Sequence, residues 1–139
     1  MHSNFEKSCG AVVYTKRGDQ LLYVIVQELE GAYSFPKGHM EGSETEEETA
    51  RREIFEEIGL DAVFLKGFRE TDEYDLREKP GTRKQVVYFL AECRRDCLEP
   101  RQGEIRQILL LPYEEALKCF DHEGARRVLT NAHCYLAGE

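Results

Sequence analysis

The 139-residue sequence predicts one α/β domain in which a mixed β-sheet is packed between helices. Three observations lead to this fold class. Short apolar, β-branched runs recur between residues 9 and 111, one helical pattern interrupts them at residues 43–59, and helical patterns return after residue 112. Because no internal repeat, low-complexity tract or linker divides the chain, we expect residues 1–139 to form a single domain.

The chain is predicted to begin with a β-hairpin. Residues 9–15 (CGAVVYT) and 21–27 (LLYVIVQ) are the two strands, joined by a turn at residues 16–19 that contains Gly18. The second run is almost wholly apolar, which is typical of a central strand covered on both faces. Residues 33–35 are expected to form a brief extended segment.

Residues 43–59 carry the signals of an amphipathic helix. Ser43 or Thr45 is the expected N-cap, and a glutamate three residues after each candidate can complete a capping box. Gly59 is the expected left-handed residue at the C-terminal end. The apolar stripe consists of Ala50, Ile54 and Ile58, with Phe55 beside it.

The second half of the chain is predicted to hold three strands and two helices. The strands are residues 61–70, 85–93 and 105–111. Residues 71–84 are polar, with Pro80 and Gly81 in their middle, and are expected to form a mobile loop. Residues 94–103 form a charged connection. The helices are residues 112–119, with Pro112 as the first helical residue, and 122–136.

The composition argues against several classes of function. With 19 Lys and Arg against 27 Asp and Glu, the net charge is −8, which disfavours a general nucleic-acid or anionic-membrane binder. No apolar run approaches the ~20 residues of a membrane span, and no basic and apolar leader marks a signal peptide. We therefore expect a cytoplasmic protein without a membrane partner, either a monomer or a homodimer.

The five cysteines are expected to be free thiols in a reducing compartment. Their number is odd, and no Cys-x-x-Cys pair occurs among Cys9, Cys93, Cys97, Cys119 and Cys134. A zinc site built on Cys93 and Cys97 is the alternative, but no second pair of ligands at suitable spacing completes it.

Residues 38–60 contain eight glutamates, a density that usually describes a solvated acidic surface. Glu53, Glu56 and Glu57 stand at i, i+3 and i+4, so a helix places them on one stripe. Each like-charge pair would destabilise an isolated helix by about 0.2–0.5 kcal/mol. Clustered carboxylates suit hard divalent cations, Mg²⁺ first and Mn²⁺ next, which makes a metal site the functional hypothesis.

The spacing in this segment resembles the signature of the Nudix hydrolases at every fixed position. In order, the specified residues are Gly38, Glu44, Arg52, Glu53, Ile54, Glu56, Glu57, Gly59 and Leu60. The resemblance implies an α/β/α sandwich with a mixed sheet. It also implies Mg²⁺-dependent cleavage of a diphosphate bond in a nucleoside diphosphate linked to another group, with water as the attacking group and a glutamate as its base.

The resemblance assigns roles to individual residues. The implied metal ligands are Glu53, Glu56, Glu57, the carbonyl of Gly38, and Glu104. Glu53, Glu57 and Glu104 are also the catalytic candidates, and the sequence leaves open which of them accepts the proton. Glu44 and Arg52 are implied to pair and to lock the loop to the helix. Only surface, capping and dipole roles are expected for Glu41, Glu46, Glu47 and Glu48.

Outside the signature, the chain resembles one branch of the family, the asymmetrical diadenosine tetraphosphate hydrolases, over most of residues 8–118. The likeness is carried by residues 33–39 (YSFPKGH), 84–92 (KQVVYFLAE), Glu104 and 112–116 (PYEEA). It implies that Tyr88 helps to stack an adenine ring. The residues implied to meet the phosphates are Lys37, His39, Lys84, Lys79 and Arg83. On the residues alone, His39 reads equally well as an exposed loop residue and Tyr88 as a core tyrosine.

Three functions remain open at this point. The first is hydrolysis of diadenosine tetraphosphate to ATP and AMP. The second is another Nudix activity, on nucleoside triphosphates, nucleotide sugars or the 5′ end of RNA; the substrate signature is weak because residues 71–83 match that branch poorly. The third is nucleotide binding or regulation without turnover, against which the intact Glu53, Glu56 and Glu57 argue.

Overall fold

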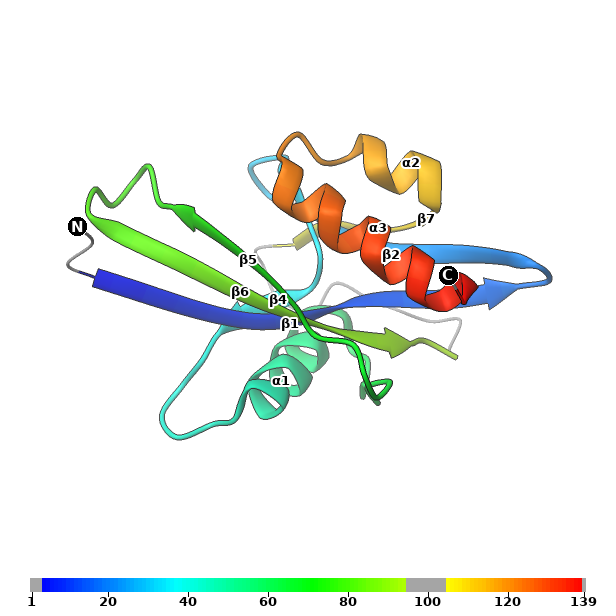
Figure 1. The fold of residues 1–139 in the computed structure, drawn as a ribbon, viewed down its shortest axis with the longest axis horizontal. Coiled ribbons are helices and arrows are strands. Elements are labelled where there is room, and N and C mark those ends of the chain that lie inside the picture. Colours follow the sequence, from blue (N-terminus) through cyan, green and yellow to red (C-terminus); the bar gives the residue numbers. More distant parts are fainter. Residues whose placement is uncertain (1–3, 95–104, 139) are drawn as a thin grey trace.

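The computed structural model describes residues 4–94 and 105–138. One mixed sheet contains the seven strands, with α1 on one face and α2 and α3 on the other (Figure 1). In chain order the elements are β1 (Asn4–Arg17), β2 (Gln20–Glu28), β3 (Tyr33–Ser34), β4 (Lys37–His39), α1 (Glu46–Ile58), β5 (Glu70–Asp75), β6 (Thr82–Glu92), β7 (Ile105–Pro112), α2 (Tyr113–Lys118) and α3 (Glu123–Ala137). The predicted α/β class with a mixed sheet is thus confirmed.

The long strand β1 organises the sheet. It runs parallel to β6 along residues 4–14 and antiparallel to β2 at residues 14–17, where the predicted hairpin forms. The turn of this hairpin is shorter than predicted, because Arg17 already pairs with Gln20. Near its start, β1 also pairs with β4 through residues 8–10. β1 therefore has β2 and β4 as partners on the same side at different positions along its length.

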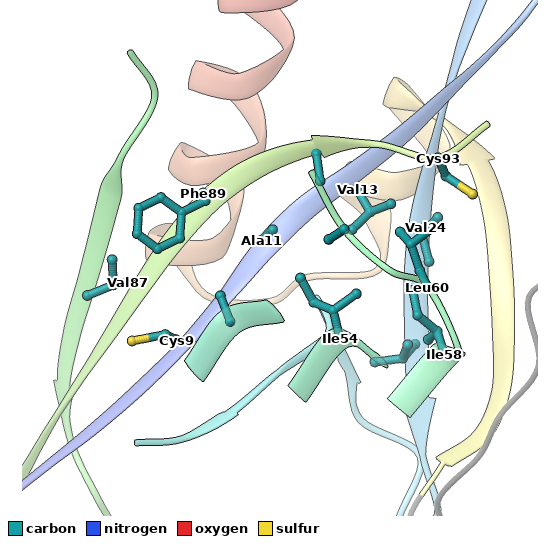
Figure 2. Close-up of a cluster of buried hydrophobic side chains, with 14 of the residues drawn as sticks. Cys9, Ala11, Val13, Val24, Ile54, Ile58, Leu60, Val87, Phe89 and Cys93 are labelled. Carbon is teal, nitrogen blue, oxygen red and sulfur yellow. The ribbon is translucent and has the colours of Figure 1, made fainter. Parts of the chain in front are cut away.

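Two apolar cores lie on the two faces of the sheet because side chains alternate along β1. Cys9, Ala11 and Val13 face α1 and contribute to the first core. Figure 2 shows this core, in which Ile54 and Ile58 of α1 lie below the strands. Val12 and Tyr14 contribute to the second core, which α2 and α3 cover. The predicted buried stripe of α1 is confirmed.

The ends of α1 follow the predicted capping signals. Thr45 is the N-cap: its Oγ1 accepts from the Glu48 N–H (3.1 Å), while Glu48 Oε1 accepts from the Thr45 N–H (2.8 Å). Gly59 ends the helix with a φ of 75°. Phe55, beside the buried stripe, is 46% exposed.

The segment between α1 and β6 differs most from the prediction. Residues 61–69 contain no regular strand, and only Phe64 forms an isolated bridge, to Ala91. The expected loop at residues 71–84 is instead mostly a hairpin, in which β5 pairs antiparallel with β6 from Glu70 opposite Tyr88 to Asp75 opposite Arg83. The loop prediction was wrong because β5 is an edge strand rich in polar side chains, so polar composition did not indicate a loop.

The remaining differences are small. Pro112 closes β7 and is the N-cap of α2, so it stands one position before the helix that it was expected to begin. Most of the charged connection at residues 94–103 lies outside the described residues. Within the part of the chain that the structure describes, no helix is long and apolar enough to cross a membrane.

Candidate active site

β4 carries the signature glycine against α1. Gly38 pairs with Cys9 of β1, and a Cβ atom at Gly38 would lie 2.0 Å from Cδ of Glu53. A side chain at this position would displace the Glu53 carboxylate, so glycine allows that carboxylate to lie directly against the backbone of β4. The contact sets the backbone of Gly38 beside the first carboxylate of the acidic stripe.

Arg52 joins the loop before α1 to the acidic stripe. Its Nε and Nη2 donate to the Glu44 carboxylate at 2.7 and 3.0 Å, and Nη2 also donates to the carbonyl of His39 at 2.9 Å. Its Nη1 donates to Glu53 (3.0 Å) and to Glu56 (3.2 Å). The hydrogen bonds from Arg52 lower the pKa of Glu44 to about 2. Glu44 therefore stays charged and keeps the loop attached to the helix.

The three carboxylates of the stripe lie in different environments. Burial raises the pKa of Glu57 to about 8, and the charge of Lys37 only partly opposes this effect. Burial also raises the pKa of Glu53, against the hydrogen bond from Arg52. Glu56 is more open, with 42% of its side chain exposed. Glu53 and Glu57 have thus lost hydration that the surrounding residues do not fully replace, a situation that a bound cation relieves.

The donor atoms fit a hard divalent cation, because the stripe and the Gly38 carbonyl offer oxygen alone. Among residues 4–94 and 105–138, however, no three His, Cys, Asp or Glu side chains form a ready-made cation site. In this structure the Arg52 guanidinium forms ion pairs with both Glu53 and Glu56. Glu104 lies outside the described residues, so its expected role stays a prediction.

The stripe carboxylates line a cavity of about 480 Å³, here called the carboxylate cavity. Its other lining residues are Ser8, Glu28, Ser34, Lys37, Gly38, His39, Glu41, Lys84 and Ile105. Lys84 is only 9% exposed, and burial together with the charge of Lys37 lowers its pKa. Ser8 has a buried Oγ without a hydrogen-bond partner among the described residues. The cavity therefore combines acidic oxygens with two lysine ammonium groups and one unsatisfied hydroxyl.

A second, smaller hollow of about 160 Å³ adjoins the first and is here called the aromatic hollow. Its ring-bearing residues are Tyr33, Phe35, Tyr74, Tyr88, Phe120 and His122. Glu28, Ser34 and Lys37 line both spaces. A molecule with an aromatic part and an anionic part could therefore span the two, with its ring in the hollow and its charges beside the lysines.

Tyr88 forms an inner wall of the aromatic hollow. It is 4% exposed, and its ring meets Phe35 edge-on at a centroid distance of 5.3 Å. Burial raises the pKa of its hydroxyl, which stays protonated. At the mouth of the hollow, Tyr74 and His122 lie with their ring centroids 6.2 Å apart. These two rings offer more accessible surface to a ligand than Tyr88 does.

The remaining sequence-predicted cations lie in different places. His39 is exposed, and its Nε2 is 3.3 Å from Oε1 of Glu6. Lys79 donates to the other oxygen of the same glutamate at 2.7 Å, and Arg83 donates to Asp75 at 3.2 Å. The structure thus brings Lys37, Lys84 and His39 to the carboxylate cavity, whereas Lys79 and Arg83 form surface ion pairs.

Glu46 makes more contacts than its expected surface and dipole role required. Its carboxylate accepts two hydrogen bonds from Arg69, at 2.8 and 2.9 Å, and forms an ion pair with Lys7. The hydrogen bonds from Arg69 lower its pKa to about 2. Glu46 therefore ties the start of α1 to β1 and to the segment before β5.

Sequence reasoning missed most of the aromatic hollow. Tyr74 lay in the supposed loop, and His122 was noted only as the start of a helix. Glu28 and Ser34 were given no role either, although Glu28 directly follows the apolar run of residues 21–27. Cys9, Cys93, Cys119 and Cys134 are free thiols. Cys97 lies outside the described residues, so the alternative zinc site is not tested.

A sheet between helices, with the glycine of β4 against an acidic helix, is an arrangement that known proteins share. The NUDIX domain matches residues 5–132, so this chain belongs to the Nudix family. The asymmetrical bis(5′-nucleosyl)-tetraphosphatase of Sus scrofa is 30% identical, over 94% of this chain and 95% of that protein. The enzyme of the same name from Caenorhabditis elegans is 26% identical, over 95% of this chain and 97% of its own length.

Solved structures give the same result. A binary complex of the C. elegans Ap4A hydrolase has a TM-score of 0.88 at 26% identity, covering 96% of this chain and 99% of that one. The NUDIX domain of Shewanella oneidensis NrtR, complexed with ADP ribose, has a TM-score of 0.76 at 16% identity, over 98% and 90% of the two chains. The second likeness supports the fold alone. Together with the family match, the first places this chain among the Nudix hydrolases.

Proposed function

We propose that this protein hydrolyses dinucleoside polyphosphates, cleaving diadenosine tetraphosphate with water to ATP and AMP in a Mg²⁺-dependent reaction. The observation that carries the proposal is the adjoining pair of spaces: buried glutamates facing two lysines in one, and aromatic rings in the other. The similarity to tetraphosphatases over nearly the whole chain supports the same substrate class.

The metal would be held by Glu53, Glu56, Glu57 and the carbonyl of Gly38, with Glu104 as the expected further ligand. Such a cation, Mg²⁺ or Mn²⁺ in its place, neutralises polyphosphate charge and activates water when bound. Arg52 would orient the carboxylates by holding Glu53 and Glu56 from one side.

The side chains of the protein would bind and position the substrate and accept a proton. Lys37 and Lys84, which line the same cavity as the glutamates, bind the anionic phosphate oxygens. As water attacks one phosphorus, the bridging P–O bond breaks and the proton of water passes to a carboxylate. Glu53, Glu57 and Glu104 are the candidates for that carboxylate, and burial makes Glu57 the strongest base of the described ones.

The aromatic hollow would hold an adenine ring. Tyr88, which the resemblance implied to be an adenine-binding residue, provides the inner wall. Tyr74 and His122 provide the ring faces at the mouth. Stacking of a base on an aromatic ring contributes roughly 1–3 kcal/mol. His39 lies at the outer edge of the carboxylate cavity and would meet a distal phosphate. A cytoplasmic location stays a prediction from the sequence.

A nucleotide panel tests this function. The purified protein is incubated with Mg²⁺ and diadenosine tetraphosphate, nucleoside triphosphates, nucleotide sugars or a 5′-triphosphorylated RNA, and the products are separated by ion-exchange chromatography. We expect equal amounts of AMP and ATP from the dinucleotide as the fastest reaction. Monophosphate plus pyrophosphate from a triphosphate as the fastest reaction would replace the proposal with another Nudix activity. Binding without any turnover would replace it with a nucleotide-binding module.

A further inference from the structure

Glu28 lies where the two spaces meet. It is the last residue of β2, at a point where the register of β2 against β7 shifts, and its half-buried side chain lines both the carboxylate cavity and the aromatic hollow. Its charge acts on groups in both spaces, because it raises the pKa of Tyr74 in the hollow and of Glu57 in the cavity as a lesser cause in each case.

The backbone around Glu28 is fixed while its carboxylate is available. The Glu28 N–H donates to the Ala32 carbonyl (2.8 Å), and the Gly31 N–H donates back to the Glu28 carbonyl (2.9 Å). Within residues 4–94 and 105–138, the Glu28 carboxylate accepts no hydrogen bond and forms no ion pair. The half-buried carboxylate therefore has acceptor capacity for a donor that a ligand brings.

The chemistry of a bound nucleotide indicates which hydrogen-bond donor would pair with the Glu28 carboxylate. With its base in the aromatic hollow and its phosphates in the carboxylate cavity, a nucleotide must place its sugar at the residues common to both. These are Glu28, Ser34 and Lys37. Lys37 can only donate, which suits phosphate, whereas an ionised Glu28 can only accept. The hydroxyls of ribose are the donors that a nucleotide offers at this position.

We propose that Glu28 accepts hydrogen bonds from the 2′- and 3′-hydroxyls of ribose, and thereby makes the protein select ribonucleotides over deoxyribonucleotides. This inference rests on the proposed function for the placing of the nucleotide. A carboxylate that takes a ribose hydroxyl is a known solution in other nucleotide sites. A deoxyribonucleotide offers no 2′-hydroxyl to the Glu28 carboxylate, while the repulsion between this carboxylate and the phosphates is unchanged. The deoxyribonucleotide therefore binds more weakly.

Selection can be measured by binding, which does not require turnover. Calorimetry compares AMP with 2′-deoxy-AMP on the wild-type protein in the presence of Mg²⁺. We expect AMP to bind about 10- to 100-fold more tightly, the range for a hydrogen bond to a charged acceptor. In Glu28→Ala the two affinities should agree within about twofold. Glu28→Gln should keep part of the difference, because its amide oxygen still accepts.

Glu30→Ala is the matched control. Glu30 lies two residues after Glu28 and carries the same charge, but its side chain is exposed and lines neither space. It should keep the full preference for AMP. Thermal unfolding of all variants checks that the fold is retained.

Equal binding of both nucleotides by the wild type, or an unchanged preference in Glu28→Ala, would overturn the inference. So would a Glu28→Ala variant that keeps the preference and only needs more Mg²⁺, since that would make Glu28 a metal ligand. Hydrolysis of diadenosine tetraphosphate is measured in parallel. A protein that prefers AMP through Glu28 but does not hydrolyse the dinucleotide supports the inference while contradicting the proposed activity.

Discussion

At the scale of single residues, the site depends on carboxylates that are held in an unfavourable environment. Glu57 and Glu53 are the clearest cases, since burial raises the pKa of both. Glu44 is the opposite case, because Arg52 supplies two hydrogen bonds and lowers its pKa to about 2. One helix and the loop before it thus hold a stabilised support carboxylate beside two that are open to a cation.

Replacing Glu57 by Gln should separate activity from stability. The ionised form of buried Glu57 destabilises the fold, so stability falls as pH rises from the ordinary pKa near 4.5 toward about 8. Without metal, Glu57→Gln should therefore unfold at a higher temperature than the wild type at pH 8 and at a similar temperature at pH 4.5. Its kcat with Mg²⁺ should fall by about 10²- to 10⁴-fold.

Calorimetric unfolding at several pH values and a steady-state assay check both parts of this prediction. Near-normal turnover in Glu57→Gln would remove Glu57 from the catalytic group. If Glu57→Gln instead unfolds at a lower temperature than the wild type at pH 8, the ionised Glu57 carboxylate does not destabilise the folded protein.

At the scale of elements, α1 is fixed to the sheet by polar contacts at its start and by apolar contacts along its length. Ile54 and Ile58 pack into the core, while Glu46 reaches Arg69 and Lys7. These ion pairs span segments far apart in the sequence. The helix that carries the candidate metal ligands is therefore held in orientation at its N-terminal end as well.

The contacts of Glu46 predict a pH-dependent stabilisation. Its folded pKa of about 2 lies below the ordinary value of 4.5, so its contribution is complete above about pH 4.5 and is lost as pH falls toward 2. Glu46→Gln should lower the unfolding temperature at pH 7, and the difference from the wild type should shrink below pH 4. Thermal unfolding followed by circular dichroism measures this. Glu47→Gln, on the exposed side of the same turn, is the control. A difference that stays constant from pH 7 to pH 3 would contradict the assignment.

At the scale of the whole molecule, the sequence predicted what depends on local signals. The caps and stripe of α1 follow from Thr45, Gly59 and a four-residue apolar repeat, and the central strands follow from continuous apolar runs. The β5–β6 hairpin was missed because an edge strand with solvent-exposed polar residues has the composition of a loop. The short β4 strand was not predicted because its pairing partner, β1, is distant in sequence.

The candidate site divides in the same way. Glu53, Glu56 and Glu57 lie on one helix, so their spacing alone placed them on one stripe. The aromatic hollow draws Phe35, Tyr74, Tyr88, Phe120 and His122 from separate segments, and only the folded sheet brings them together. Likewise, nothing in the sequence says that Glu28 lines both spaces, because this depends on how β2 ends relative to α1 and β5.

The central claim is that the acidic face of α1 binds a divalent cation, and Mn²⁺ titration followed by electron paramagnetic resonance tests it most directly. The signal of free Mn²⁺ should fall on addition of wild-type protein, and excess Mg²⁺ should restore it by competition. The double variant with Glu56→Gln and Glu57→Gln should leave the free Mn²⁺ signal unchanged, whereas the Glu47→Gln control should bind like the wild type. Wild-type affinity for Mn²⁺ in the double variant would contradict the claim.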